Sequence, residues 1–329
     1  MANLYDGMEV EFEAVLVNES QRVPGVQYQQ VSEKRYLTAD HCRDDWQVEL
    51  CSRHHPRRVA YRAPAAARAI AHAVERPGCV AGGFSALALY GMPFLVEGAD
   101  TLLFYATSKN QLGGEQAPTV RRPSRANMDT WTLVHRGVSF RAAAPAEALV
   151  QALQQVNNGE HGWGVVSIVG WAPRDVMSLQ LIDCARRFLG VTTREIQECA
   201  RGKVNARWVK RLMSHSSGLA DSPKETEMRL LVTALAKRYG YTVQEQVPFF
   251  VDGKLVTIFD LAIPELRIAV MYDGAHHLDW KQRKKDSSIT IKMAAAGWTP
   301  ARCATETMFE CLELIEGIMQ KVHASGPRE

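Results

Sequence analysis

Residues 257–277, with the sequence TIFDLAIPELRIAVMYDGAHH, decide how the C-terminal third of this 329-residue chain folds. Two apolar runs, 257–263 and 267–272, flank the dipeptide Pro264-Glu265. Both runs have the length and the β-branched content of buried strands, and proline favours a turn between them. The stretch therefore predicts two adjacent strands joined by a tight turn.

Two carboxylates accompany these expected strands. Asp260 lies inside the first strand, and Asp273 follows the second directly, ahead of Gly274. A charge within an apolar strand is costly to bury unless it is paired or bound to a metal. Since divalent cations prefer oxygen ligands, we expect Asp260 and Asp273 to bind one Mg²⁺ or Mn²⁺. The alternative is a structural carboxylate at Asp260, held by hydrogen bonds.

Three further side chains are candidates for the same site. His276 and His277 follow the second strand, where a histidine can act as a general base or hold the leaving oxygen in a hydrolysis, although a surface histidine is the commoner case. Glu225 lies three residues after Ser222, with Pro223 between them, which is the pattern of a helix capping box. Glu225 is thus expected to cap a helix, and it also lies in the domain that holds the two aspartates.

The sequence of residues 222–329 predicts one domain with alternating helices and strands. We expect a helix from residue 222, strands near 246–251, 255–263, 266–272 and 298–302, a helix ending at Gly297, and a closing helix over 306–323. The element order is therefore α-β-β-β-α-β-α. A mixed sheet flanked by helices is the architecture that this order favours.

Several residues whose side chains can act in catalysis or binding follow one another in a characteristic order. They are Glu225, Asp260-Leu261, the run 268–274, His276-His277, Asp286, and Gly297-Trp298 with Arg302. This series resembles the Vsr-like branch of the restriction-endonuclease-like, or PD-(D/E)XK, superfamily in its small bacterial form. The resemblance covers about a third of the chain. It implies a restriction-endonuclease-like fold, a bound divalent metal and hydrolysis of DNA phosphodiesters, with Glu225 reaching toward the metal.

One position departs from the family pattern. Met271 stands where the family usually has a metal-binding glutamate. Vsr-type nucleases also lack an acid there and are active, so the departure leaves hydrolysis open. With one oxygen ligand fewer, weakened or absent catalysis with retained DNA binding is the second outcome.

Composition places the whole chain among ordinary globular proteins. An apolar fraction of 46% and a charged fraction of 23% are typical of a folded, water-soluble chain, and the length favours more than one domain. A net charge of +3 is too small to indicate nucleic-acid binding without local clustering. The seven cysteines show no C-x-x-C spacing and the N-terminus shows no signal peptide, so we expect reduced thiols and a cytoplasmic location.

The sequence of the N-terminal part supports fewer structural predictions. Residues 65–75 are alanine-rich and favour a helix, and 85–90 favour a second helix closed by Gly91. The segment around Ser85 is similar to the "S-A-A-x-x-H-G-L" helix of AbiEi-type antitoxins and related actinobacterial proteins, with Tyr90 in place of the histidine. A small helix packed by alanine and leucine explains the same residues. We expect a mostly helical region with a small β part.

The chain therefore divides into three expected regions. Residues 1–142 form an N-terminal region, winged-helix-like or regulatory, 143–221 a helical linker region with a basic helix, and 222–329 the restriction-endonuclease-like domain. The boundary before 222 follows the linker-like residues 215–221.

Two basic clusters are candidates for contact with DNA. Lys203, Arg207, Lys210 and Arg211 fall at i, i+4, i+7 and i+8, one face of a helix expected over 203–213. Four cations on one face would neutralise phosphates. A solvated face, or pairing with Glu195 and Glu198, explains them as well. Arg283, Lys284 and Lys285 form the second cluster.

Two functions follow from these expectations. The first is a metal-dependent DNA endonuclease with an N-terminal DNA-binding or regulatory region. The second is a non-catalytic DNA-binding regulator, similar to an AbiEi-type antitoxin, that carries a degenerate nuclease fold.

Overall fold

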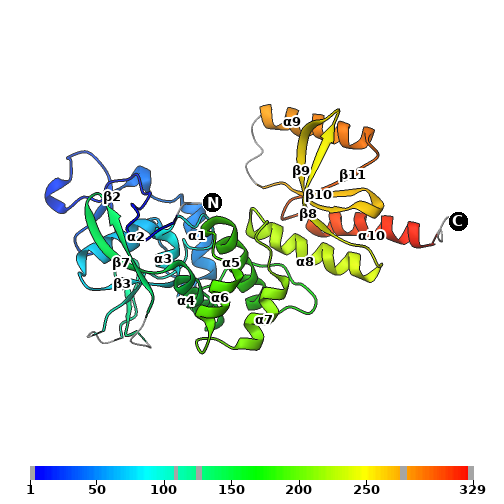
Figure 1. The fold of residues 1–329 in the computed structure, drawn as a ribbon. Coiled ribbons are helices and arrows are strands. Elements are labelled where there is room, and N and C mark those ends of the chain that lie inside the picture. The colour runs from blue at the N-terminus through cyan, green and yellow to red at the C-terminus, as the bar shows by residue number, and fades with distance from the viewer. Residues whose placement is uncertain (1–3, 107–109, 124–127, 275–279, 325–329) are drawn as a thin grey trace. The chain divides into compact units, whose positions relative to one another are not determined.

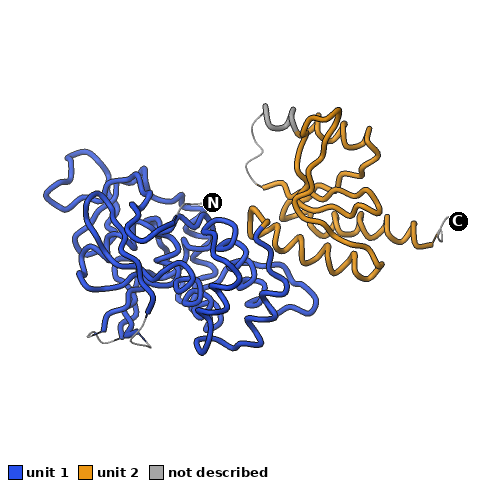
Figure 2. The backbone as a smooth tube through the Cα atoms, viewed as in Figure 1, with its two compact units in different colours: residues 1–218 blue, residues 219–329 orange. Residues whose placement is uncertain are grey.

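A computed structural model describes residues 4–106, 110–123, 128–274 and 280–324, and the side chains of 280–285 lie outside the described part. The chain forms two compact units, residues 1–218 and 219–329 (Figures 1 and 2). Both units mix helices with sheets. Within the described residues, no helix combines the length and the apolar character needed to cross a membrane.

The first unit is built on a five-stranded mixed sheet. Its strands have the spatial order β5-β4-β3-β7-β6. They are β3 (Val80–Ala81), β4 (Leu102–Phe104), β5 (Thr119–Arg121), β6 (Thr130–His135) and β7 (Val138–Ala143). The pairs β3–β7 and β4–β5 are parallel, whereas β3–β4 and β6–β7 are antiparallel. A separate antiparallel pair, β1 (Tyr28–Gln30) and β2 (Tyr36–Thr38), precedes it.

Helices pack around this sheet and continue past it. They are α1 (Asp45–His54), α2 (Ala65–Glu75), α3 (Gly83–Leu89), α4 (Pro145–Asn157), α5 (Pro173–Leu189), α6 (Thr193–Ala200) and α7 (Ala206–His215). Helix α4 is central because it packs against α3, α5 and α6 (Figure 1). Its contact with α3 crosses the boundary expected between residues 142 and 143.

The expectation of a mostly helical N-terminal part with a small β part fits the first unit as a whole, but its strands are concentrated in residues 28–143. Both sheets of the first unit lie there. Strands β3 and β5 are two and three residues long, too short to show the two-residue alternation on which strand prediction depends. They are strands because their neighbours complete their hydrogen bonds.

Two glycines let α4 close the start of α3. The Gln151 Oε1 accepts a hydrogen bond from the Gly83 N–H at 2.9 Å, and the Gln155 Oε1 accepts one from the Phe84 N–H at 3.4 Å. The helix N-cap, Gly82, has no side chain to do this. A Cβ at Gly83 would lie 2.0 Å from the Gln155 Oε1, and the φ angle of +49° there is one that side chains disfavour.

The second unit has the element order expected from its sequence. Its elements are α8 (Pro223–Arg238), β8 (Gln244–Val251), β9 (Lys254–Ile263), β10 (Ile268–Tyr272), α9 (Trp280–Ala295), β11 (Thr299–Cys303) and α10 (Met308–Ala324). The sheet order is β11-β10-β9-β8, with β10 parallel to β11 and antiparallel to β9. The prediction of a mixed sheet flanked by helices is confirmed for this unit.

Helices cover both faces of this sheet. Figure 1 shows α9 on one side of the strands and α8 with α10 on the other. Ile289 and Met293 of α9 pack on Phe259 and Ala269, which anchors that helix to the sheet. The C-terminal end of β10 lies opposite the middle of β9, and Asp260 there lines a small pocket together with Glu225 at the start of α8.

Replacing Gly83 with alanine is expected to destabilise the first unit. The new Cβ collides with the Gln155 amide, and an alanine at this position must adopt a positive φ angle. We therefore expect the free energy of unfolding to fall by about 2 kcal/mol or more. Urea denaturation followed by circular dichroism measures this loss. Gly114→Ala is the matched control, because nothing lies within 4 Å of the added atom there. Equal stability of the two variants would contradict the capping role.

Candidate functional site

Glu225 caps the helix on which it lies. The Ser222 hydroxyl accepts a hydrogen bond from the Glu225 N–H at 3.2 Å and donates one to the Glu225 Oε1 at 3.1 Å. The Asp221 N–H donates to the Glu225 Oε2 at 2.8 Å. The capping interaction expected from the sequence is therefore present at the Ser222 side chain. It fixes the Glu225 carboxyl at the N-terminus of α8.

Asp260 lies on β9, next to the point where pairing with β10 ends. The Tyr272 N–H donates a hydrogen bond to the Asp260 Oδ2 at 2.7 Å. The β9–β10 register pairs Leu261 with Val270, so its continuation places Asp260 opposite Met271. The carboxylate thus substitutes for a backbone carbonyl as acceptor for the end of β10.

Asp273 is held by an arginine from the neighbouring strand. The Arg302 Nε and Nη2 donate to the two carboxylate oxygens at 2.8 and 2.6 Å, a bidentate pair. The Asp273 N–H donates to the Cys303 carbonyl at 2.8 Å, so the backbone also fixes this residue. The Arg302 Nη2 lies 3.4 Å from the Asp286 Oδ1 as well. Arg302 therefore joins β11, the end of β10 and α9.

Glu225 and Asp260 influence each other's charge. Burial, together with repulsion from Asp260, raises the pKa of Glu225 to about 7. Burial is the main cause that raises the pKa of Asp260 to about 6. Repulsion from Asp221 and Asp273 acts in the same direction, and the Tyr272 N–H and the Arg302 charge oppose it. Within the described residues neither carboxyl has an ion-pair partner. Below about pH 6 both carboxyls hold protons that ordinary surface carboxyls have lost, and Glu225 keeps its proton up to about pH 7.

Met271 supplies no oxygen ligand to this carboxylate group. Its side chain packs against the apolar cluster that includes Phe259, Ala269 and Ile289. Among the described residues, no group of three or more His, Cys, Asp or Glu side chains is arranged to hold a metal ion. His276 and His277 lie outside the described residues.

The structure separates the four cations expected on one helix face. Lys203 precedes α7, because the Asn205 side chain caps that helix by accepting from the Arg207 and Trp208 N–H groups. Lys203 binds the Glu147 carboxylate. The expectation of one helix over 203–213 is wrong at its start, where a polar N-cap ends the turn before the helix begins.

Arg211 also has a partner, and two cations remain exposed. The Arg211 guanidinium lies 3.3 Å from Asp175 and stacks over the Trp171 ring at 4.7 Å. Arg207 and Lys210 are exposed, and no ion pair of theirs occurs within the described residues. The backbone of Arg283, Lys284 and Lys285 belongs to α9, and their side chains lie outside the described part.

The sequence pattern missed the partner of Asp273. Arg302 was expected only as part of the resemblance, with no contact assigned. The parallel register of β10 and β11 places Arg302 beside Met271, two residues before Asp273. An arginine in an otherwise apolar strand was the signal, because a buried guanidinium needs a carboxylate within reach.

Comparison of the chain with family models, curated proteins and solved structures gave no match. The candidate site therefore stands on its own geometry.

The raised pKa values predict that the second unit loses stability as pH rises. The folded state holds protons that the unfolded chain releases near pH 4, so the stabilisation is complete below that pH and is lost as pH rises through about 6 to 7. Urea unfolding at pH 5 and 7.5 measures this fall. We expect Asp260→Asn, which keeps the Tyr272 acceptor, to reduce the fall by about 2 kcal/mol.

Asp252→Asn is the matched control for this experiment. Asp252 is exposed in the β8–β9 turn with a positive φ that asparagine also adopts. The control should keep the wild-type pH dependence. A wild-type chain whose stability rises from pH 5 to 7.5 would contradict the proton-holding pair.

Proposed function

We propose that the second unit is a metal-dependent DNA endonuclease whose catalysis is weak. The observation that carries this proposal is the pair Glu225 and Asp260, two buried carboxyls that repel each other and have no ion-pair partner within the described part of the chain. Such a pair is costly to the fold unless a proton or a cation lies between them. Proteins retain such destabilising pairs of charged groups mainly at functional sites.

Asp260 and Asp273 would hold the metal, with Glu225 reaching it through water. A bound Mg²⁺ or Mn²⁺ polarises a phosphate and lowers the pKa of its water. Asp260 fits this role because one of its oxygens, Oδ1, makes no hydrogen bond within the described residues while Tyr272 orients the other. Asp273 fits less well, since both its oxygens accept from Arg302. Each oxygen keeps a lone pair for a metal, but the Arg302 charge opposes a second cation there, which supports weak rather than efficient hydrolysis.

Arg207 and Lys210 support contact with DNA in the first unit. They are exposed near the start of α7, three residues apart, and thus lie on neighbouring positions of one face. Two unpaired cations neutralise phosphates at a lower desolvation cost than the paired Lys203 and Arg211. Their contribution is an electrostatic one, without sequence information.

The second candidate is a DNA-binding regulator without catalysis. Two observations favour it: Met271 packs into the apolar core, and Arg302 already balances the Asp273 charge. In that case the Glu225 and Asp260 carboxyls bind protons and do not bind a metal ion. The two candidates predict different responses to Mn²⁺.

Mn²⁺ is expected to raise the melting temperature of the wild-type chain. A ligand that binds only the folded state stabilises it by mass action, and at one hundred times Kd the gain is about 2.7 kcal/mol. Asp260→Asn should abolish the rise, because it removes the ligand charge. Met271→Glu should enlarge it, because it places an oxygen opposite Asp260. Differential scanning fluorimetry measures all three, with plasmid nicking as the activity assay.

The pattern of responses separates the two candidates. Stabilisation and Mn²⁺-dependent nicking in the wild type support the endonuclease. A response in Met271→Glu alone supports the regulator. If neither chain responds, the metal proposal fails and Asp260 is a structural carboxylate. Asp252→Asn, distant from the pair in the hairpin turn, should behave as the wild type.

Changing both Arg207 and Lys210 to glutamine is expected to weaken the salt dependence of DNA binding. Removal of two phosphate contacts should reduce the slope of log affinity against log salt by about 1.8. Fluorescence anisotropy with duplex DNA over a salt series measures the slope. The double change of Lys34 and Arg58, two exposed cations elsewhere in the first unit, is the matched control. An unchanged slope in the Arg207/Lys210 variant would exclude this surface as the DNA contact.

A further inference from the structure

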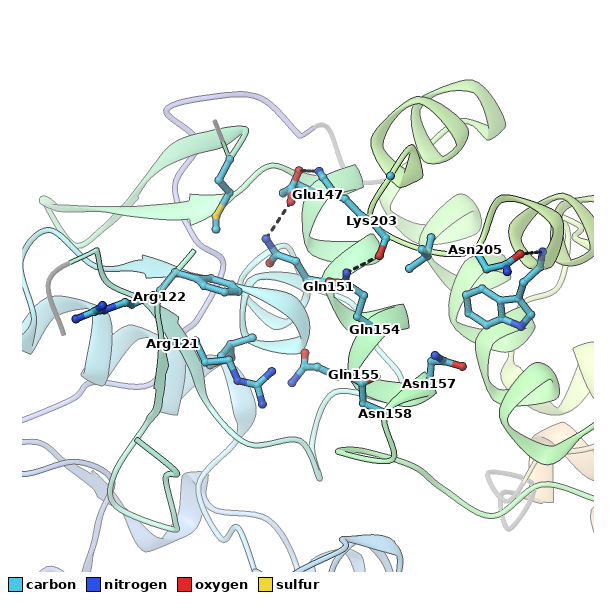
Figure 3. Close-up of a pocket in the computed structure, with 16 residues that line it drawn as sticks. Arg121, Arg122, Glu147, Gln151, Gln154, Gln155, Asn157, Asn158, Lys203 and Asn205 are labelled. Carbon is cyan, nitrogen blue, oxygen red and sulfur yellow. Dashed lines mark hydrogen bonds and ion pairs between the residues drawn. The ribbon is translucent and has the colours of Figure 1, made fainter. Parts of the chain in front are cut away.

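Three reactive side chains of the first unit lie together beside two cavities. Glu147 and Lys203 line a cavity of about 630 Å³ (Figure 3) and also a second one of about 680 Å³. Cys199 lines the second cavity with them. The three residues come from α4, α6 and the turn before α7, so the tertiary fold brings them together. The carboxylate site of the second unit involves none of them.

The Cys199 thiol is hydrogen-bonded to a carboxylate. Its Sγ–H donates to the Glu147 Oε2 at 3.3 Å, and the Lys203 Nζ donates to the Cys199 Sγ at 3.3 Å. Lys203 also donates to the Glu147 Oε2 directly. A thiol with a base within hydrogen-bond reach is the arrangement that activates cysteine as a nucleophile.

Neighbouring residues hold Glu147 in the position of that base. Glu147 is 6% exposed, and its Oε1 accepts a hydrogen bond from the Gln151 Nε2 at 3.2 Å. The Gln151 Oε1 in turn accepts from the Gly83 N–H at 2.9 Å, so the start of α3 fixes the amide. Figure 3 shows both contacts of the carboxylate, with Gln151 and with Lys203. A base oriented by a third group completes the arrangement of an activated nucleophile.

The protonation states of the cluster suit attack assisted by a general base. Burial, together with the Glu147 charge, raises the pKa of Cys199 to about 11, so the thiol keeps its proton at neutral pH and needs a base to remove it. Burial lowers the pKa of Lys203, but contacts with Glu147 and Cys199 outweigh burial and raise it, so Lys203 is a cation. An ammonium has three N–H donors, and these contacts use two of them.

The second cavity has room for an acyl group beside the thiol. Its volume lies within the range of small-molecule sites. Apolar side chains form part of its lining, namely Leu4, Trp131, Leu189 and Val191. Two acids of the lining, Glu195 and Glu198, already bind Thr192 and Arg194. The apolar part of the lining suits the hydrocarbon portion of an acyl compound whose carbonyl carbon lies at the Cys199 Sγ.

We propose that Cys199, Glu147 and Lys203 form a second catalytic site, which hydrolyses a carboxylic ester or amide through a thioester. The Cys199 Sγ bonds to the carbonyl carbon while its proton passes to the Glu147 Oε2, and the third N–H of Lys203 stabilises the oxyanion. The bond to the leaving alcohol or amine then breaks, and that group takes the proton from Glu147. Water attacks the thioester, one of its protons passes through Glu147 to the departing Sγ, and the carboxylic acid is released.

Two chromogenic probes test the proposal on the full chain: p-nitrophenyl acetate, an ester, and p-nitroacetanilide, the amide with the same acyl group. We expect turnover, with mass spectrometry of rapidly quenched peptides finding the acetyl group on Cys199. Glu147→Gln should slow acetylation of Cys199 on the order of a hundredfold, because it removes the base. Lys203→Gln should slow it by a similar order, because it removes the oxyanion donor. Cys199→Ala, which keeps the ion pair of Glu147 with Lys203, should abolish turnover.

Cys42→Ala is the matched control, because the Cys42 thiol is also partly exposed but donates to the Thr38 carbonyl at 3.6 Å and not to an acid. It should react as the wild type. Circular dichroism separates loss of the fold from loss of chemistry, and Cys199→Ala still tests the proposal if Glu147→Gln does not fold. Turnover of both probes identifies amides as substrates, and turnover of the ester alone identifies esters. Equal acetylation of Cys42 and Cys199, acetylation without turnover, or wild-type turnover in Cys199→Ala would overturn the proposal.

Discussion

The carboxylate of Asp260 lies in an apolar strand with no ion pair within the described residues, and the arrangement of the second unit depends on this charge. One of its oxygens serves as acceptor for the Tyr272 N–H, so the pairing of β9 with β10 passes from backbone to side chain at that point. Burial beside Glu225 keeps both acids protonated at a pH where carboxyls are normally charged. In the proposed function, a divalent ion would take the place of these protons.

Arg302 has the opposite effect in the same unit, because it supplies a positive charge beside a carboxylate. Its bidentate contact gives Asp273 a counter-charge within the protein. The unit thus contains one carboxylate that is balanced and a pair that is not. The proposed weak nuclease and the proposed regulator differ in whether a metal binds at these carboxylates. A metal at Asp273 would compete with the Arg302 charge, so this competition decides between the two proposed functions.

The sequence predicted the second unit far better than the first. Strands β8 to β11 lie within two residues of the expected ranges, because each is at least five residues long. Strands β3 and β5 were not predicted, since two or three residues carry no periodicity. The binding of Lys203 to Glu147, 56 positions away, is a tertiary contact that helix periodicity does not contain. Glu195 and Glu198, the expected partners, instead cap α6 and bind Arg194. For the candidate site, the sequence named the carboxylates but not the arginine that balances one of them.

The backbone hydrogen bond from Asp273 to Cys303 has a consequence for how such a site changes in evolution. Because the main chain positions residue 273, its side chain can be exchanged for an amide without moving β10 or β11. Loss of the acid at this place keeps the backbone contact but leaves the Arg302 guanidinium without its bidentate partner.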